Sequence, residues 1–179
     1  MDANEWCPHK GSTWFIPGKS SIKLSNVHRP VVIDDVTGTP ACPPYAISRT
    51  HVDVYEFWPS DLQQVFAQAG MPRRAPPLNP DCANAGQQVG DPPRITSPLR
   101  GSSYAMRLNK QDQEGIAFNA TADADAHALF WFVNDAYVGR SPPGESLFWQ
   151  PLNAGHYDVR VVYDHGRSDH RPLDVNLLE

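Results

Sequence analysis

The chain has 179 residues, a length that fits one medium domain or two small ones. Its 18 prolines and 12 glycines argue against long helices and favour short strands and loops. A formal net charge of -5, without a block of lysines and arginines, disfavours a nucleic-acid partner, because a nucleic-acid groove normally needs a basic face. The longest apolar run, 128–133, is too short to span a bilayer, and the first residues lack the basic and apolar regions of a signal peptide. We therefore expect a cytosolic protein, or a piece of an exported protein whose signal lies upstream.

The first part of the chain, 1–82, is predicted to be a small strand-rich segment. Its first 20 residues carry Trp6, Trp14 and several glycines and prolines, which is typical of extended chain without regular structure. Alternating or clustered apolar residues then predict short strands. These predicted strands lie at 21–25, 30–34 and 52–57.

One helix is predicted over 60–70. Ser60 would be its N-cap and Gln63 would complete a capping box, while Gly70 would end it. The apolar residues of this segment repeat at helical spacing, so that they share one face. We expect this face, which includes Leu62, Val65 and Phe66, to pack on the preceding strands.

Residues 83–94 have the composition of a proline-stiffened linker, and the pattern changes to regular strands over 95–179. Apolar runs at 129–133 and 136–140 flank Asn134 and Asp135, and this predicts a β-hairpin with a tight turn. The first of these runs is apolar on both faces, which indicates a central strand. Roughly seven short strands with turns between them predict an antiparallel β-sandwich. Its core should include Phe118, Trp131, Tyr157, Val159 and Val161.

Several short motifs suggest chemistry but are better explained otherwise. Residues 20–23, Ser-Ser-Ile-Lys, match the acylation motif of penicillin-recognising enzymes, yet that motif must open a helix and this segment alternates like a strand. Acidic residues and histidines on predicted loops could be imagined as metal ligands, but solvated turns are the better interpretation. These residues are Asp123, Asp125 and His127, and then His165, Asp169 and His170. Trp131 and Trp149 lie in apolar runs and should pack in the core, whereas the roles of Trp6 and Trp14 stay open.

Four segments of the second half have distinctive sequences. They include Ile-Thr-Ser-Pro-Leu-Arg-Gly at 95–101 and Leu-Phe-Trp-Phe-Val-Asn-Asp at 129–135, and the others lie at 146–155 and 161–168. Together they resemble the C-terminal module of the penicillin-binding protein 1C family of bifunctional peptidoglycan synthases. Upstream, Tyr-Glu-Phe-Trp-Pro-Ser-Asp-Leu at 55–62 resembles the segment that precedes this module in the family. The resemblance extends from about residue 12 to the end of the chain.

The resemblance implies an immunoglobulin-like sandwich in the periplasm, on a parent protein anchored in the inner membrane. The family's glycosyltransferase and transpeptidase domains would lie upstream. Their catalytic Glu and Ser have no counterparts here, so no catalytic, cofactor-binding or metal-binding residue is assigned. We therefore expect this chain to be a non-catalytic accessory module, although its parent would be an enzyme that polymerises and cross-links peptidoglycan.

The expected partners are the catalytic domains of the same synthase or other periplasmic proteins, such as an α2-macroglobulin-like protein, and peptidoglycan itself. A peptidoglycan-binding carbohydrate module is the alternative function. A row of exposed Trp or Tyr side chains on one sheet would favour that alternative.

The periplasm implied by the resemblance is oxidising, and this suits a disulfide among the three cysteines. We predict a bridge between Cys42 and Cys82, because it would tie the start of the linker back to the small segment. A bridge between Cys7 and Cys42 would close a loop of similar length, so loop entropy does not decide between the two pairings.

Overall fold

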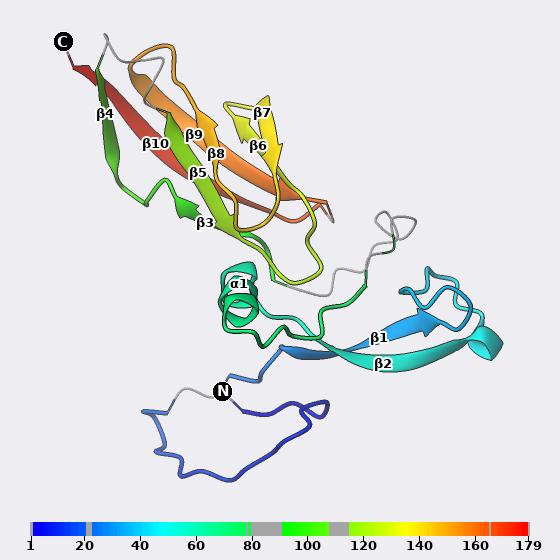
Figure 1. Ribbon diagram of the computed structural model, residues 1–179. Coiled ribbons are helices and arrows are strands. Elements are labelled where there is room, and N and C mark those ends of the chain that lie inside the picture. The colour runs from blue at the N-terminus through cyan, green and yellow to red at the C-terminus, as the bar shows by residue number, and fades with distance from the viewer. Residues whose placement is uncertain are drawn as a thin grey trace.

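The computed structural model describes residues 2–20, 23–77, 79, 91–107, 115–164 and 166–178. The fold is mainly β, as predicted, and has one α-helix among these residues. Two larger sheets form one end of the molecule, helix α1 and a ribbon of two strands lie next to them, and the N-terminal segment lies beyond the ribbon (Figure 1). In chain order the elements are β1 (His28–Asp34), the 3-10 helix η1 (Ile47–Arg49), β2 (Thr50–Glu56), α1 (Ser60–Gln68), β3 (Arg94–Ser97), β4 (Ser103–Arg107), β5 (Ile116–Thr121), β6 (Leu129–Val133), β7 (Ala136–Ser141), β8 (Leu147–Trp149), β9 (Gly155–Tyr163) and β10 (Ser168–Leu178).

The two larger sheets pack face to face as a sandwich. One sheet has the strand order β4-β10-β9-β6-β7 and the other has the order β3-β5-β8. Neighbouring strands are antiparallel, except that β10 and β4 pair in parallel. The predicted hairpin strand β6 lies inside its sheet, between β9 and β7, as its apolar composition indicated.

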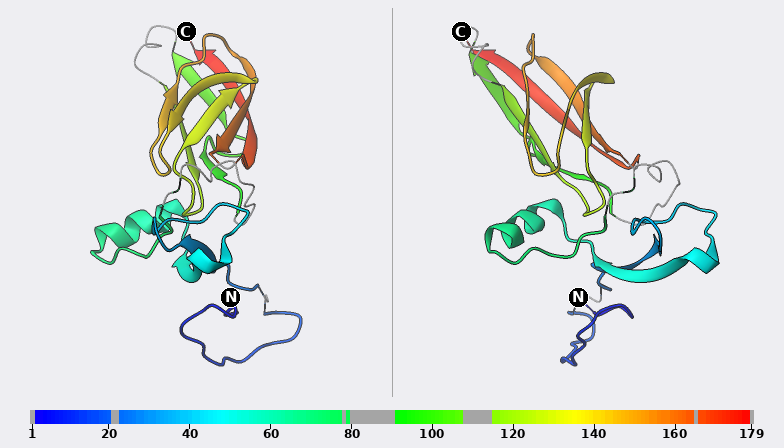
Figure 2. Two further views of the ribbon diagram at one scale, coloured as in Figure 1. Left: turned by 90° about the vertical axis from the view of Figure 1, so that its right-hand side faces the viewer. Right: turned by 45° about the vertical axis from the view of Figure 1, so that its right-hand side comes forward.

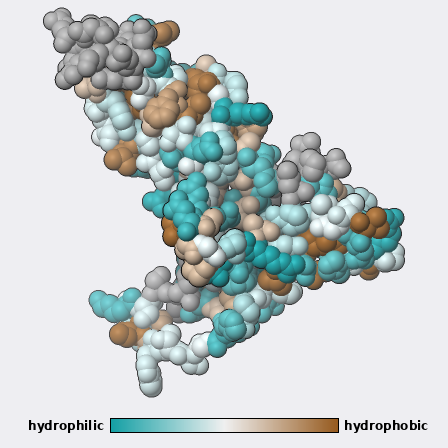
Figure 3. Space-filling model, viewed as in Figure 1, coloured by the Kyte–Doolittle hydropathy of each residue, from teal (hydrophilic) through white to brown (hydrophobic). Residues whose placement is uncertain are grey.

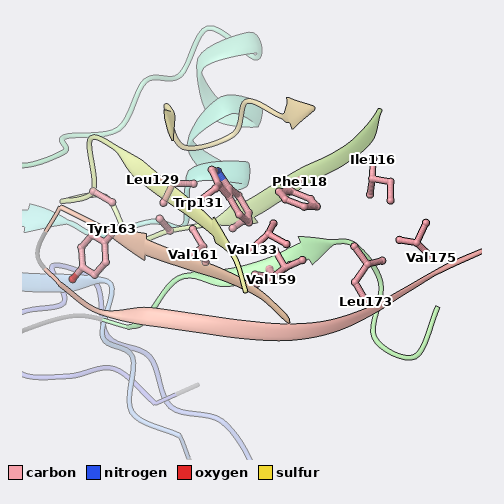
Figure 4. Close-up of a cluster of buried hydrophobic side chains, with 14 of the residues drawn as sticks. Ile116, Phe118, Leu129, Trp131, Val133, Val159, Val161, Tyr163, Leu173 and Val175 are labelled. Carbon is pink, nitrogen blue, oxygen red and sulfur yellow. The ribbon is translucent and has the colours of Figure 1, made fainter. Parts of the chain in front are cut away.

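Side chains from both sheets fill the space between them (Figure 4). Trp131, Phe118, Val159 and Val161 are fully buried, which confirms the core expected from their alternation with polar neighbours. Phe118 packs close to two tryptophans, and its ring centroid is 5.5 Å from that of Trp131 and 5.6 Å from that of Trp149. Tyr157 was expected inside, but it is only partly buried: its ring packs on Trp149.

The tight turn of the hairpin has the predicted residues and conformation. Asn134 and Asp135 adopt positive φ angles of 48° and 66°, which a two-residue turn of this kind requires and which these two residue types tolerate. The Asn134 side-chain oxygen also accepts the backbone N–H of Asp158 at 2.8 Å. This bond ties the turn to the neighbouring strand β9.

Two strands of the sandwich were missed or shortened in the prediction. β3 was not expected, and β10 begins before Leu173, where the alternating pattern started. Pro172 interrupts that pattern, but β4 pairs with β10 only from Asp174 onward. The missing N–H of Pro172 therefore faces a side of the strand that has no partner strand at this level.

The N-terminal part is thinner than the sandwich and has its own small core. β1 and β2, which overlap the strands predicted at 30–34 and 52–57, pair in antiparallel register, and Val31, Ile33, Tyr55 and Phe57 are buried there. The strand predicted at 21–25 is not seen in its described residues, 23–25, where only an isolated bridge joins Leu24 to Asp2. Ser21 and Ile22 lie outside the described residues.

The helix forms at the predicted place but is held differently. Its N-cap is Pro59, not Ser60, and no side chain caps it, so the predicted capping box is wrong. Leu62 and Val65 are 40% and 56% exposed, so the predicted packing of the apolar face on the strands is wrong as well. The end is as predicted: Gly70 has a φ of 71°, and its N–H donates to the Ala67 carbonyl at 3.1 Å.

Candidate functional site

A buried ion pair joins the N-terminal part to the sandwich. Arg29 of β1 and Asp123, from the connection between β5 and β6, approach to 2.7 Å, and their side chains are only 8% and 4% exposed. The guanidinium also lies over the ring of Phe57, 4.4 Å from its centroid. Asp123 accepts a further bond from the N–H of Asp91 at 3.2 Å. The solvated turn expected at Asp123 is therefore wrong, because this carboxylate is part of a junction.

Small residues let the backbones approach at this junction. The chain reads Ala-Asp-Ala-Asp-Ala over 122–126, and all three alanines are buried. Ser60 donates its N–H to the Ala122 carbonyl at 2.9 Å, and its hydroxyl accepts the Ala122 N–H at 3.1 Å. Ala124 packs in the small core beside Val31 and Ile33. The alternation of alanines with acidic residues at 122–126 is a sequence signal for close packing. It does not indicate which segment packs there.

A cleft of about 370 Å³ lies between α1 and the loops of the sandwich. Its lining is mostly polar and small: Ser60, Gln63, Gln64, Ala67, Asp123, Ala126, His127 and Pro143. A serine, a histidine and an aspartate therefore share one cleft, as in acyl-transfer enzymes. However, Asp123 pairs with Arg29, and the Ser60 hydroxyl accepts the Ala122 N–H. The hydrogen bonds described for His127 come from its backbone N–H, which donates to the Asp164 carboxylate and not to Ser60 or Asp123. This arrangement lacks the nucleophile–base contact that activation of a serine needs.

Two of the other predicted loop residues, Asp125 and Asp169, also make structural contacts. Asp125 forms a half-buried ion pair with Arg167 at 3.3 Å, so its solvated interpretation is wrong as well. Asp169 accepts the N–H of Ile95 at 2.9 Å, which ties β10 to β3, and the side chain of His170 is exposed. His165 lies outside the described residues. No cluster of three or more potential metal ligands occurs in the part of the chain that the structure describes.

The cysteines are partly described. Cys7 is a free thiol, with its sulfur 3.7 Å from Nδ1 of His28, and Cys42 is disulfide-bonded. Cys82 lies outside the described residues, so the pairing of Cys42 with Cys82 stays a prediction. Asn79 lies close to this region, since its side-chain amide donates to the Pro40 carbonyl at 2.6 Å.

The N-terminal loop, which we define as residues 8–20, is the most exposed part of the molecule. Every residue of this loop is exposed, and Trp14 is 98% exposed. The Ser20 hydroxyl accepts the N–H of Ile16 at 3.0 Å, so this serine serves a turn and not a catalytic helix. At the base of the loop, Asn4 donates its side-chain amide to the carbonyls of Ser25 and His28 at 2.9 and 2.8 Å.

Comparison with known proteins decides the family. Residues 82–175, more than half of the chain, match the penicillin-binding protein C-terminus family. The chain belongs to this family. The match covers nearly all of the sandwich, since it includes β3 to β9 and reaches Val175 in β10.

Other comparisons add little to the family assignment. No curated protein matches the chain. A solved structure of a Bacteroides ovatus protein, SGBP-B of a mixed-linkage glucan utilization locus in complex with a mixed-linkage heptasaccharide, is 22% identical with a TM-score of 0.30. That likeness covers 49% of this chain and 24% of the other, so this chain spans about a quarter of that protein. In the part of the chain that the structure describes, no helix has the length and apolar composition that a membrane span requires.

Few aromatic side chains of the sandwich face solvent in this member of the family. Of the tryptophans and tyrosines described there, Tyr137 is the exposed one, at 57%. Its ring meets that of Phe132 edge-on, and Arg160 lies over Phe132. Phe148 is exposed too, but it lies on β8, in the other sheet. The described part of the sandwich therefore has no row of exposed Trp or Tyr on one sheet.

Proposed function

We propose that this chain is a non-catalytic accessory module of a bifunctional peptidoglycan synthase, and that it supports wall assembly through protein contacts. In this proposal the module works in the periplasm, on a parent anchored in the inner membrane. The catalytic region of the same synthase is the main partner, and a periplasmic protein such as an α2-macroglobulin-like protein is a further one. Membership of the penicillin-binding protein C-terminus family supports this placement.

The position of the aromatic side chains favours protein contacts over glycan binding. Carbohydrate modules stack sugars on exposed aromatic rings, but here Trp131 is buried, Trp149 is half-buried in the core and Tyr137 stands alone. Large exposed apolar groups occur in both parts of the molecule, at Trp14, Ile16 and Ile47 in the N-terminal part and at Leu99, Phe148 and Leu152 in the sandwich. Exposed apolar groups of this kind are typical of surfaces that bind proteins.

A binding comparison tests the proposal. The chain is immobilised and offered two partners in separate runs: the same synthase lacking this module, and purified peptidoglycan sacculi. We expect the synthase to be retained and the sacculi to be retained weakly, because a chain with net charge -5 has no general attraction to a partly anionic polymer. Tight, saturable binding to sacculi that is lost in Tyr137→Ala would instead establish the carbohydrate-binding alternative.

A labelled penicillin tests the non-catalytic part of the proposal. We expect no covalent adduct on this chain, because the Ser20 hydroxyl is held in a loop turn and the serine of the α1 cleft lacks a base. The full-length synthase is the positive control, since its upstream domain would carry the reactive serine. An adduct on Ser20, Ser21 or Ser60 would contradict this part of the proposal.

A further inference from the structure

The tip of the N-terminal loop presents three large apolar side chains to water. Trp14 is almost completely exposed, and the next two residues, Phe15 and Ile16, are 49% and 62% exposed. Apolar surface of the N-terminal segment is visible at the lower left of Figure 3. Large apolar groups that follow one another in an exposed loop mark a place where another molecule binds.

The tip already has a defined shape before any partner is bound. The N–H groups of Lys19 and Ser20 donate to the carbonyl of Ile16 at 3.1 and 2.9 Å. Gly18 supplies the positive φ of 73° that this turn needs. Because the turn at 16–20 that follows Trp14 is formed in advance, less conformational entropy is lost in this part of the loop when Trp14 enters a partner's pocket.

The charge around the loop differs from that of the rest of the protein. No Asp or Glu occurs from Trp6 to Ile33, although the whole chain has a net charge of -5. Three lysines lie in this stretch, Lys10, Lys19 and Lys23, and all three are exposed. A partner that complements the loop therefore has an apolar pocket on an acidic face.

We infer that the N-terminal loop is the anchor by which this module docks on the catalytic region of its own synthase, with Trp14 in an apolar pocket on an acidic face of that region. This inference rests on the proposed function. The loop lies at the end of the molecule away from the sandwich in all three views (Figures 1 and 2). Docking there leaves the sandwich free. A partner on the same polypeptide is also present at a high effective concentration, so a small contact is enough.

Exposed Trp and Lys side chains can also bind an anionic lipid surface, so a membrane is the alternative partner of the loop. Lipid-surface binding usually takes a cluster of about four to eight basic residues. The loop offers two lysines, Lys10 and Lys19, with Lys23 just beyond it, and Trp14 lies two residues before the hydrogen-bonded turn at 16–20. A single aromatic anchor with a few flanking charges is more typical of a protein interface, where one buried Trp carries much of the binding energy.

Site-specific photo-cross-linking in the full-length synthase tests the inference. A photoreactive amino acid replaces Trp14 in one variant and Leu152, an 85% exposed residue of the loop between β8 and β9, in the matched control. We expect irradiation to join position 14, but not position 152, to peptides of the catalytic region. A lipid adduct at position 14, an adduct with a different polypeptide, or no adduct would each overturn the inference.

Binding in trans separates this inference from the proposed function. The chain is added to the synthase lacking the module, and Trp14→Ala is compared with Leu152→Ala; both positions are exposed, so neither change should unfold the chain. We expect Trp14→Ala to raise Kd by about tenfold or more and Leu152→Ala to leave it unchanged. If both variants bind as the parent chain does, the proposed function stands and the anchor is elsewhere. If the parent chain itself does not bind, the proposed function fails.

Vesicles with and without anionic lipid are the membrane control. We expect neither kind of vesicle to bind the parent chain or the two variants. Binding of the parent chain to anionic vesicles that is lost in Trp14→Ala would overturn the inference, because the partner of the loop would then be a membrane and not a protein.

Discussion

At the scale of single residues, the pair of Arg29 and Asp123 is the contact whose loss we expect to cost most outside the sandwich core. A buried ion pair adds little over an apolar pair, but removing one partner leaves the other charge buried without compensation. Asp123→Asn should therefore lower the free energy of unfolding by about 3–5 kcal/mol, measured by urea denaturation. Asp135→Asn is the control: Asp135 pairs with Arg160 but is 89% exposed, so its loss should cost less than about 1 kcal/mol. Equal small effects for both variants would show that the junction does not contribute as the contacts indicate.

Asp34 gives a prediction about pH. Its side-chain oxygen accepts the N–H groups of Val36 and Thr37 at 2.8 and 3.1 Å, and these bonds hold the pKa of the carboxyl below its ordinary value of 3.8. The stabilisation is therefore present above this value, and it is lost as the pH falls through the lowered pKa of the folded protein. An NMR titration should give Asp34 a midpoint below 3.8. Asp34→Asn keeps an oxygen acceptor for the turn but should remove this part of the acid sensitivity; a midpoint at or above 3.8 would contradict the assignment.

At the scale of elements, α1 is amphipathic but turns much of its apolar side outward. We expect Val65→Lys to change the free energy of unfolding by no more than about 0.5 kcal/mol, because this side chain is 56% exposed. Trp131→Ala in β6 should cost about 3–5 kcal/mol, since it removes a fully buried ring and leaves the Ser141 hydroxyl without its indole partner. Thermal or urea unfolding of the two variants side by side measures this contrast. A large cost for Val65→Lys would restore the interpretation of this face as core.

The sequence predicted those elements whose evidence is local. Period-2 alternation was enough to find β9 and to place Val159 and Val161 in the core, and Asn134 with Asp135 was enough to find the hairpin turn. The helical spacing in α1 likewise predicted a helix. It could not predict which side of the helix would be covered, because that depends on residues far away in the chain.

The junction shows the same limit for polar residues. Ser60 is a residue type that commonly caps helices. In the structure, however, its hydroxyl accepts the N–H of Ala122, which lies 62 positions away in the chain. Asp123 has the local pattern of a solvated turn, but Arg29 lies beside it in the fold. Long-range partners of this kind leave no periodic trace in the sequence, so polar residues of a junction look like loop residues.

At the scale of the whole molecule, the junction makes the ribbon, the helix and the sandwich dependent on one another. The Arg29–Asp123 ion pair, the two bonds between Ser60 and Ala122, and Ala124 in the small core all join residues of the N-terminal part to one loop of the sandwich. A docking contact at the N-terminal loop would therefore orient the sandwich as well. This geometry suits a module that is held at one end and presents its other end to further partners.

The disulfide is the last prediction at this scale. The structure leaves Cys7 as a free thiol and has Cys42 in a disulfide, and we predict Cys82 as the partner, which would join the start of the linker to the ribbon end of the molecule. Digestion without reduction should release a linked peptide that contains Cys42 and Cys82, and a thiol reagent applied to the unfolded, unreduced chain should label Cys7 alone. Closing a loop of about 40 residues should contribute about 4 kcal/mol, so Cys82→Ser should lower the free energy of unfolding by about this amount, while Cys7→Ser should change it far less. A linked peptide that contains Cys7 would show that the pairing is wrong, and equal stability of the two variants would show that the bridge does not stabilise the fold.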